Sequence, residues 1–265
     1  MEFGIETVAA LGLVALVAGF FDSIAGGGGL LTVPALLLAG FDPVSAIATN
    51  KLQGSFGTAS ATFSFARAGR IAWAEALPMA AVSGAASVAG ALAVQAIPAA
   101  ALAAIVPFLM LGMALYFGLS KGMGDADARS RVGPTAFTLT LAPIIGFYDG
   151  FFGPGAGSFY MVGFVTLLGF GLLRATAHTK ALNLASNVGS LALYAASGLI
   201  VWPVGLVMGV AALTGAQIGS RLALRMGARL IRPLIVVVCC AVALRLLMDP
   251  ANPARAWLSK ALAGG

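Results

Sequence analysis

Two lysines lie inside strongly apolar stretches of this sequence, and their chemistry is the first feature to explain. Lys51 and Lys180 stand 129 positions apart, each in a segment dominated by aliphatic residues. Burying an ammonium group in lipid costs from about 3 to well above 10 kcal/mol, so each lysine must face a cavity or a partner. Two interpretations stay open. The lysines bind a small anion, which we favour, or they form structural ion pairs with Asp22 and Asp149.

A glycine-rich break precedes each lysine. Gly26–Gly29 is a run of four glycines, and residues 153–157 read Gly-Pro-Gly-Ala-Gly. Such runs interrupt a helix, and within a membrane the freed amides must meet protein, water or a ligand. The segments that follow begin at Leu30 and Ser158, so their N-termini should point at the break and attract an anion. The predicted substrate-binding residues are Gly26, Gly27, Gly28, Gly29, Asn50, Lys51, Gln53, Gly153, Gly155, Gly157, Ser158, Lys180, Asn183 and Asn187.

Other polar residues near the breaks have two interpretations each. Asn183 and Asn187 lie four positions apart, hence on one helix face, where they can bind anion oxygens or join helices. Asp22, Asp149 and His178 are candidates for proton coupling, because an ionisable group inside a membrane can carry a proton. Alternatively, the two aspartates hold backbone amides of the glycine breaks, and His178 lies near a membrane end.

The paired motifs belong to an internal repeat. Gly19-Phe20-Phe21-Asp22 is matched 127 positions later by Gly146-Phe147-Tyr148-Asp149, and after a two-residue insertion the match continues from Lys51 to Lys180. Repeats with glycine-broken helices are typical of secondary transporters, whose site forms where the halves meet. We predict a first membrane repeat over 1–120, a polar linker over 121–133, a second repeat over 134–248 and a short tail over 249–265.

The composition requires an all-α integral membrane protein. The chain is 60% apolar and only 9% charged, whereas soluble domains average about 25% charged residues. The sequence predicts about 8–10 membrane helices. The apolar segments are 5–24, 30–41, 43–66, 72–97 and 99–118, then 135–152, 157–173, 175–196, 200–220 and 230–248. Since a span needs about 20 residues, segment 30–41 is too short and 157–173 is marginal. We expect half-helices or re-entrant arms there.

Arginine placement predicts that the two halves are inverted. Arg67 and Arg70 follow the third segment of the first half, while the matching place near Ser197 is uncharged. Conversely, Arg221 and Arg225 begin a basic join after the fourth segment of the second half, and the first half has none there. If basic loops are cytoplasmic, equivalent loops face opposite sides. The halves can instead form a parallel repeat if only one of the first two segments in each half crosses the membrane.

No sequence pattern predicts an enzyme, a cofactor or a metal centre. A Walker motif for ATP is missing, and the four glycines lack the βαβ context of a dinucleotide site. The cations are scattered among apolar spans, so we expect no binding of nucleic acid.

The repeated motifs resemble the TauE/SafE sulfite-exporter family. Asp22, the run from Ile24 to Pro34 and Ala48-Thr49-Asn50-Lys51 resemble its first repeat, and residues 153–158 with 177–187 resemble its second. The resemblance covers about residues 5–248. It implies a multi-pass carrier of the bacterial inner membrane that moves sulfite or organosulfonates outward, driven by protons. A passive anion channel and a membrane accessory protein without transport are the alternatives. Oligomeric state, including a homo-oligomer, is left open.

Overall fold

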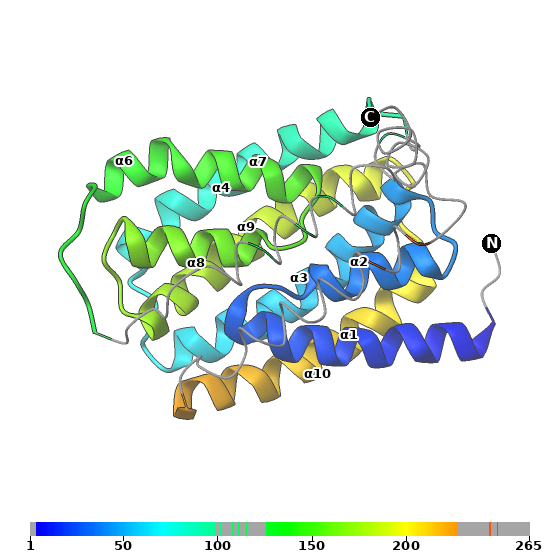
Figure 1. Cartoon of the computed structure of the whole chain (residues 1–265), viewed down its shortest axis with the longest axis horizontal. Helices are drawn as coiled ribbons and strands as arrows, with labels where there is room; N and C mark the ends of the chain where they lie inside the picture. Colours follow the sequence, from blue (N-terminus) through cyan, green and yellow to red (C-terminus); the bar gives the residue numbers. More distant parts are fainter. Residues whose placement is uncertain are drawn as a thin grey trace, which may run out of the picture.

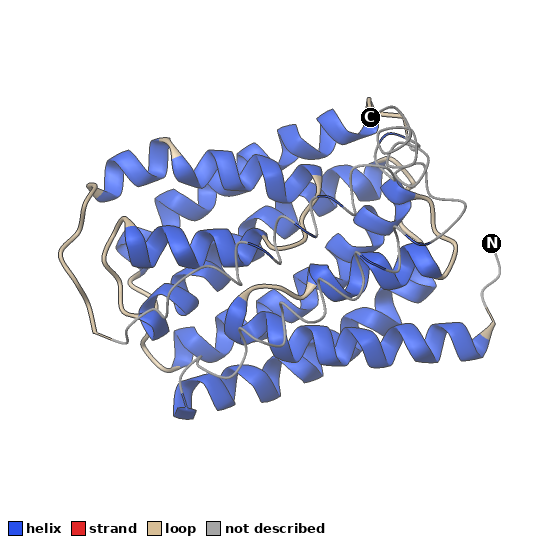
Figure 2. Cartoon of the chain, in the orientation of Figure 1, coloured by secondary structure: helices blue, strands red, loops and turns tan. Residues whose placement is uncertain are grey.

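The computed structural model describes residues 4–98 and 126–226, with a few single positions outside these ranges. Figure 2 shows helices and connecting loops throughout the described part, without a strand. The predicted fold class, an all-α membrane protein, is confirmed. The predicted segments 99–118 and 230–248 and the tail 249–265 lie almost wholly outside the described residues.

The described helices follow the same order in both halves, long, short, long, long, except that the first helix of the second half is broken (Figure 1). They are α1 (Ile5–Ala25), α2 (Gly29–Leu38), α3 (Pro43–Arg67), α4 (Trp73–Gln95), α6 (Pro134–Leu139), α7 (Leu141–Phe151), α8 (Ala156–Thr166), α9 (Leu172–Ala196) and α10 (Trp202–Met226).

The helices that follow the glycine breaks are short. α2 has 10 residues and α8 has 11, so each rises about 15 Å, half of a hydrocarbon core of about 30 Å. The 10-residue α2 is as short as the sequence indicates for segment 30–41. The predicted segment 157–173 is wrong at its far end, because the helix stops at Thr166. Gly169 then takes a φ of 70° in the loop that leads to α9.

The break between α6 and α7 corrects the predicted continuous segment 135–152. The helix is interrupted at Thr140, whose φ and ψ are −117° and −72°. Pro143 lies three residues later and has no N–H group, so the Leu139 carbonyl loses its helical donor. The proline ring also crowds that carbonyl, which kinks the chain at this point.

Polar helices occupy the middle of the molecule and apolar helices surround them. In the described part, α1, α4 and residues Trp202–Arg225 of α10 are long and apolar enough to cross a membrane. α3 and α9 have 25 residues each, but they carry many buried polar side chains and pack against each other. Because neighbouring helices shield them from lipid, their backbone and polar groups can be satisfied inside the protein.

The halves interlock through their first and fourth helices. α1 packs along α10 of the other half, and α7 packs along α4. A Cβ on Gly19 would overlap the Ala212 carbonyl oxygen, and one on Gly146 would overlap the Ser83 carbonyl oxygen. These contacts join equivalent positions of the two repeats. Small residues therefore let the backbones approach closely, as is common for helices in lipid.

The described arginines gather at one end of the helices. The first helices of the two repeats run in from opposite ends of the molecule (Figure 1). α1 starts at the end where the N-terminus lies, and α6–α7 starts at the other end. The ends of α3 and α10 lie at the same end as the start of α6, with Arg67, Arg225 and Arg131 there. This arrangement supports the inverted orientation, which stays a prediction with respect to the membrane.

The Gly19 contact predicts a position-specific loss of stability. Gly19→Ala should lower the melting temperature in detergent by roughly 2–10 °C, because overpacking costs about 1–3 kcal/mol. Gly12→Ala is the matched control on the same face of α1, since its Cβ would meet only Val207 Cγ1 at 3.5 Å. The control should keep or slightly raise stability, because alanine favours a helix by up to about 1 kcal/mol. Equal melting temperatures for both variants would contradict the close crossing.

Candidate functional site

The two glycine breaks meet in the interior of the protein. Ser158, at the start of α8, donates its backbone N–H to the Gly26 carbonyl at 3.1 Å and its Oγ to the Ala25 carbonyl at 2.7 Å. A Cβ on Gly26 would overlap the backbone of Gly157. The sequence prediction that the breaks converge is supported by this geometry. The amides are not all free, however, because Gly28 N–H also donates to Asp22 Oδ1 at 3.0 Å.

Left-handed glycines shape both breaks. Gly26 has a φ of 79° and closes α1 with a hydrogen bond from its N–H to the Asp22 carbonyl. Gly153, the equivalent residue, has a φ of 95°. A side chain at either position would be strained in this conformation, and the chain could not reverse so tightly into α2 or α8.

Two ion pairs cross from one half to the other. Lys51 Nζ lies 2.5 Å from Asp149 Oδ1, and Lys180 Nζ lies 3.0 Å from Asp22 Oδ2. Both lysine side chains are fully buried. The pairs are equivalent under the internal repeat, since each lysine binds the aspartate of the opposite half. Of the two alternatives for the lysines, this structure therefore shows the ion-paired arrangement.

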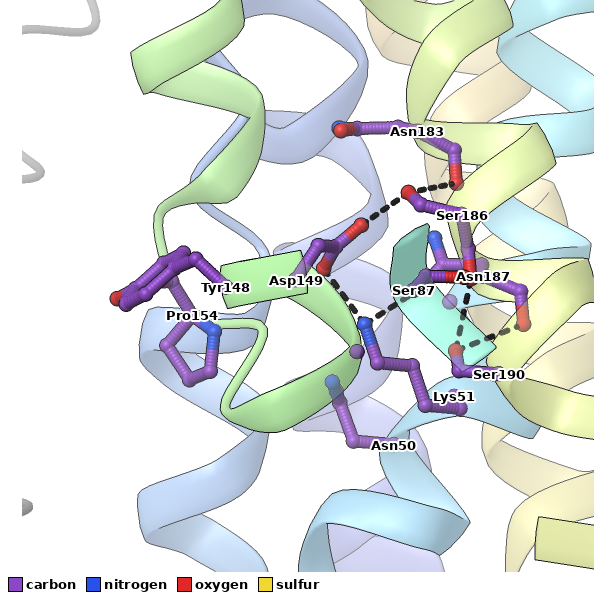
Figure 3. A network of polar contacts seen from close by, with 12 residues as sticks. Asn50, Lys51, Ser87, Tyr148, Asp149, Pro154, Asn183, Ser186, Asn187 and Ser190 are labelled. Carbon is purple, nitrogen blue, oxygen red and sulfur yellow. Dashed lines mark hydrogen bonds and ion pairs between the residues drawn. The ribbon is translucent and has the colours of Figure 1, made fainter. Parts of the chain in front are cut away.

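Further side chains fix the Lys51–Asp149 pair (Figure 3). Ser186 Oγ donates to Asp149 Oδ2, and Lys51 Nζ also donates to Asn187 Oδ1 at 3.2 Å. Both partners come from α9, so this pair is held between α3, α7 and α9. A buried ion pair needs such additional hydrogen bonds to offset the cost of leaving water.

A small cavity lies where the breaks and the central helices meet. Its volume is about 40 Å³, room for about three water molecules. Most of the predicted site residues line it, and Gly19, Gly54, Gly57 and Thr58 were missed. The lining residues are Gly19, Asp22, Gly26, Gly28, Gly29, Asn50, Gln53, Gly54, Gly57, Thr58, Asp149, Gly153, Gly155, Gly157, Asn183 and Asn187. The missed α3 residues continue the helical spacing of Asn50 and Gln53, which is the signal that could have found them.

Carboxamides supply neutral hydrogen-bond donors to the cavity. Asn50 Oδ1 accepts from Thr32 Oγ1 at 2.5 Å, and Asn187 Oδ1 accepts from Lys51. With these oxygens engaged, their NH₂ groups are the ends left to donate to a ligand. Asn183 is only 5% exposed, and its Oδ1 has no hydrogen-bond partner among the described residues. An unpartnered buried amide in a polar cavity indicates a ligand or water position.

Five predicted site residues do not line the cavity: Gly27, Lys51, Ser158, Lys180 and His178. Each lysine lies behind the aspartate with which it pairs, and the aspartates line the cavity. Ser158 joins the two breaks by hydrogen bonds. His178 is fully buried between Phe164 and Phe170. Its Nδ1 bonds the Arg174 carbonyl, and its Nε2 accepts from Ala72 N–H. The structure therefore does not bring His178 to the cavity.

The start of α9 holds the end of the linker. Arg174 pairs with Glu75 at 2.9 Å and with Asp127 at 3.0 Å. The Gly171 N–H donates to Asp127 Oδ1, and this bond, together with Arg174, lowers the pKa of Asp127 from its ordinary value. In the described part of the chain, no three His, Cys, Asp or Glu side chains come together to hold a metal ion.

Comparisons with known proteins agree on one family. The family model for Sulfite exporter TauE/SafE matches residues 11–246. The Probable membrane transporter protein ORF9 of Sinorhizobium sp is 55% identical over 97% of this chain and 98% of its own length. The Probable membrane transporter protein YfcA of Escherichia coli strain K12 is 48% identical over 89% of this chain and 88% of its own length. No solved structure matches the chain.

The buried Lys51–Asp149 pair predicts strongly coupled effects on stability. Lys51→Met should destabilise the protein by about 3–5 kcal/mol, because it leaves the Asp149 charge buried without its cation. Adding Asp149→Asn should recover much of this loss, as followed by thermal unfolding in detergent.

Glu75→Gln is the control for a surface pair and should cost less than about 1 kcal/mol. If Lys51→Met and the double variant unfold at the same temperature, Lys51 and Asp149 do not stabilise each other.

Proposed function

This chain belongs to the Sulfite exporter TauE/SafE family and is a multi-pass membrane transporter, and we propose that it carries a small sulfur oxyanion, such as sulfite or an organosulfonate, together with protons. The observation that supports this proposal best is the cavity between the glycine breaks. Neutral N–H donors line it, and two lysines stand behind it. Anion oxygens accept hydrogen bonds, so this lining suits them.

The charge balance of the site supports coupling to protons. Lys51, Lys180, Asp22 and Asp149 sum to zero when all four are ionised. A monoanion that enters this neutral cluster would leave a net negative charge away from water, which is costly. A proton on one aspartate restores neutrality. We therefore propose one proton for each negative charge carried.

Relative movement of two inverted halves would expose the cavity alternately to each side of the membrane. The breaks lie between the halves, as binding sites of inverted-repeat transporters do. We assign the arginine-rich end to the cytoplasm by the positive-inside rule, and the membrane to the bacterial inner membrane. The proposed direction of transport is outward, down the gradient of the anion where that gradient exceeds the opposing proton gradient. We assign Lys180 and the lining amides to direct anion binding, and Lys51 to the positive charge behind Asp149.

Flux measurements on purified protein in proteoliposomes test this function. Radiolabelled sulfite should enter in a saturable manner, faster with an inward proton gradient, and internal unlabelled sulfite should accelerate its entry by counterflow. A channel would show no counterflow, and an accessory protein would show no flux. Sulfoacetate as a competitor should compete if the site accepts sulfonates.

Removal of the cation tests the site itself. Lys180→Met should reduce flux more than tenfold, because the cavity then faces an uncompensated Asp22. Gly12→Ala, remote from the cavity, is the control for reconstitution. Sulfite flux that survives Lys180→Met at the wild-type rate would assign this lysine a purely structural role.

A further inference from the structure

The two cross-half ion pairs are chemically alike but differ in their surroundings. The Asp149 side chain is 5% exposed, and that of Asp22 is 19% exposed. Asp149 is bound by two side chains, Lys51 and Ser186. Asp22 is bound by Lys180 and by the N–H of Gly28 at the N-terminus of α2. Both aspartates border the cavity, but Asp149 is the more enclosed of the two.

The sequence explains this asymmetry through the repeat. With the offset that relates Lys51 to Lys180, Ser186 of α9 corresponds to Gly57 of α3. Asn187 likewise corresponds to Thr58, whose hydroxyl donates back to the Gly54 carbonyl at 2.8 Å. Gly57 has no side chain to offer Asp22. In the second half, the Ser186 hydroxyl binds Asp149. At the equivalent place in the first half there is no hydroxyl on Asp22, and Gly57 and Thr58 line the cavity there.

We propose that Asp22 is the carboxylate whose place the transported anion takes. Its oxygens accept hydrogen bonds from the Lys180 ammonium and the Gly28 N–H. These are donors that a sulfur oxyanion needs. The buried Asn183 lines the same cavity, and its NH₂ group supplies a third donor. Protonation of Asp22 releases these donors, while Asp149 stays paired and holds the halves together. This inference rests on the proposed function.

The groups facing Asp22 make it the carboxylate that exchanges. Lys180 faces it from α9, and Lys51 with Asp149 lies across the cavity. Neither α2 nor α8 carries a charged residue. On α10 the two cations, Arg221 and Arg225, are exposed. When a proton neutralises Asp22, Lys180 loses its counter-charge and a monoanion restores it, so the cluster stays neutral.

Asparagine variants separate the two aspartates. In Asp22→Asn, sulfite counterflow should continue at a rate that no longer depends on pH, while accumulation driven by a proton gradient is lost. In Asp149→Asn, counterflow and accumulation should fall together, and the melting temperature should drop as it does in Lys51→Met. Proton-driven accumulation by Asp22→Asn at the wild-type level would overturn the inference and leave sulfite transport standing.

A serine on α3 provides a test that does not remove a charge. Gly57→Ser places a hydroxyl on α3 at the position equivalent to Ser186, so that it can bind Asp22 as Ser186 binds Asp149. The added carbon fits, because it would lie 3.6 Å from Ala212 Cβ. A new hydrogen bond to the Asp22 carboxylate favours its charged form. The pH dependence of sulfite flux should therefore shift by about one unit to the acid side.

Gly57→Ala isolates the effect of the added carbon, and only the difference between serine and alanine counts. Identical pH profiles for Gly57→Ser and Gly57→Ala would overturn the role of Asp22, even if Asp22→Asn does not fold. Wild-type protein that carries neither sulfite nor sulfoacetate would instead refute the proposed function. The two failures are therefore distinguishable.

Discussion

The pairing of two buried lysines with two aspartates is the constraint on which the rest of the structure depends. Lys51 and Lys180 are fully buried, and among the described residues each pairs with a carboxylate of the opposite half. An unpaired charge at such a place would cost several kcal/mol, so neither half can satisfy its own site. This explains why the polar helices α3 and α9 lie in the middle. It also agrees with the packing of the apolar α1 and α7 against helices of the opposite half.

The glycine breaks solve a second problem, how to bring aspartates and backbone donors to the centre without exposing peptide groups to lipid. α2 and α8 are half the length of a span, and they return the chain from the interior. Ser158 joins the breaks by donating to the carbonyl groups of Ala25 and Gly26. Irregular backbone is tolerated there because protein and a small polar cavity surround it.

Much of this could be predicted from the sequence where one residue type has few alternatives. A lysine in an apolar helix needs an anion or a carboxylate, and a run of glycines ends a helix. The Asp42-Pro43 start of α3 follows from capping alone, and Asp42 Oδ1 accepts from the N–H groups of Val44 and Ser45. The choice of Asp149 for Lys51 could not be predicted, because within-half and cross-half pairs have the same chemistry. Gly57 was missed because its contribution is an absent side chain.

On the proposed function, the position of the ion pairs links movement to cargo. Both pairs cross the boundary between the halves, so relative movement of the halves must strain them, and the more exposed Asp22–Lys180 pair is the one that opens. A buried ammonium that loses its carboxylate needs another anion, or the movement becomes costly. A bound oxyanion meets that need for Lys180, whereas a site that has bound the proton alone does not. Movement of the loaded carrier is then favoured over movement of the partly loaded one, which is the condition for coupled transport.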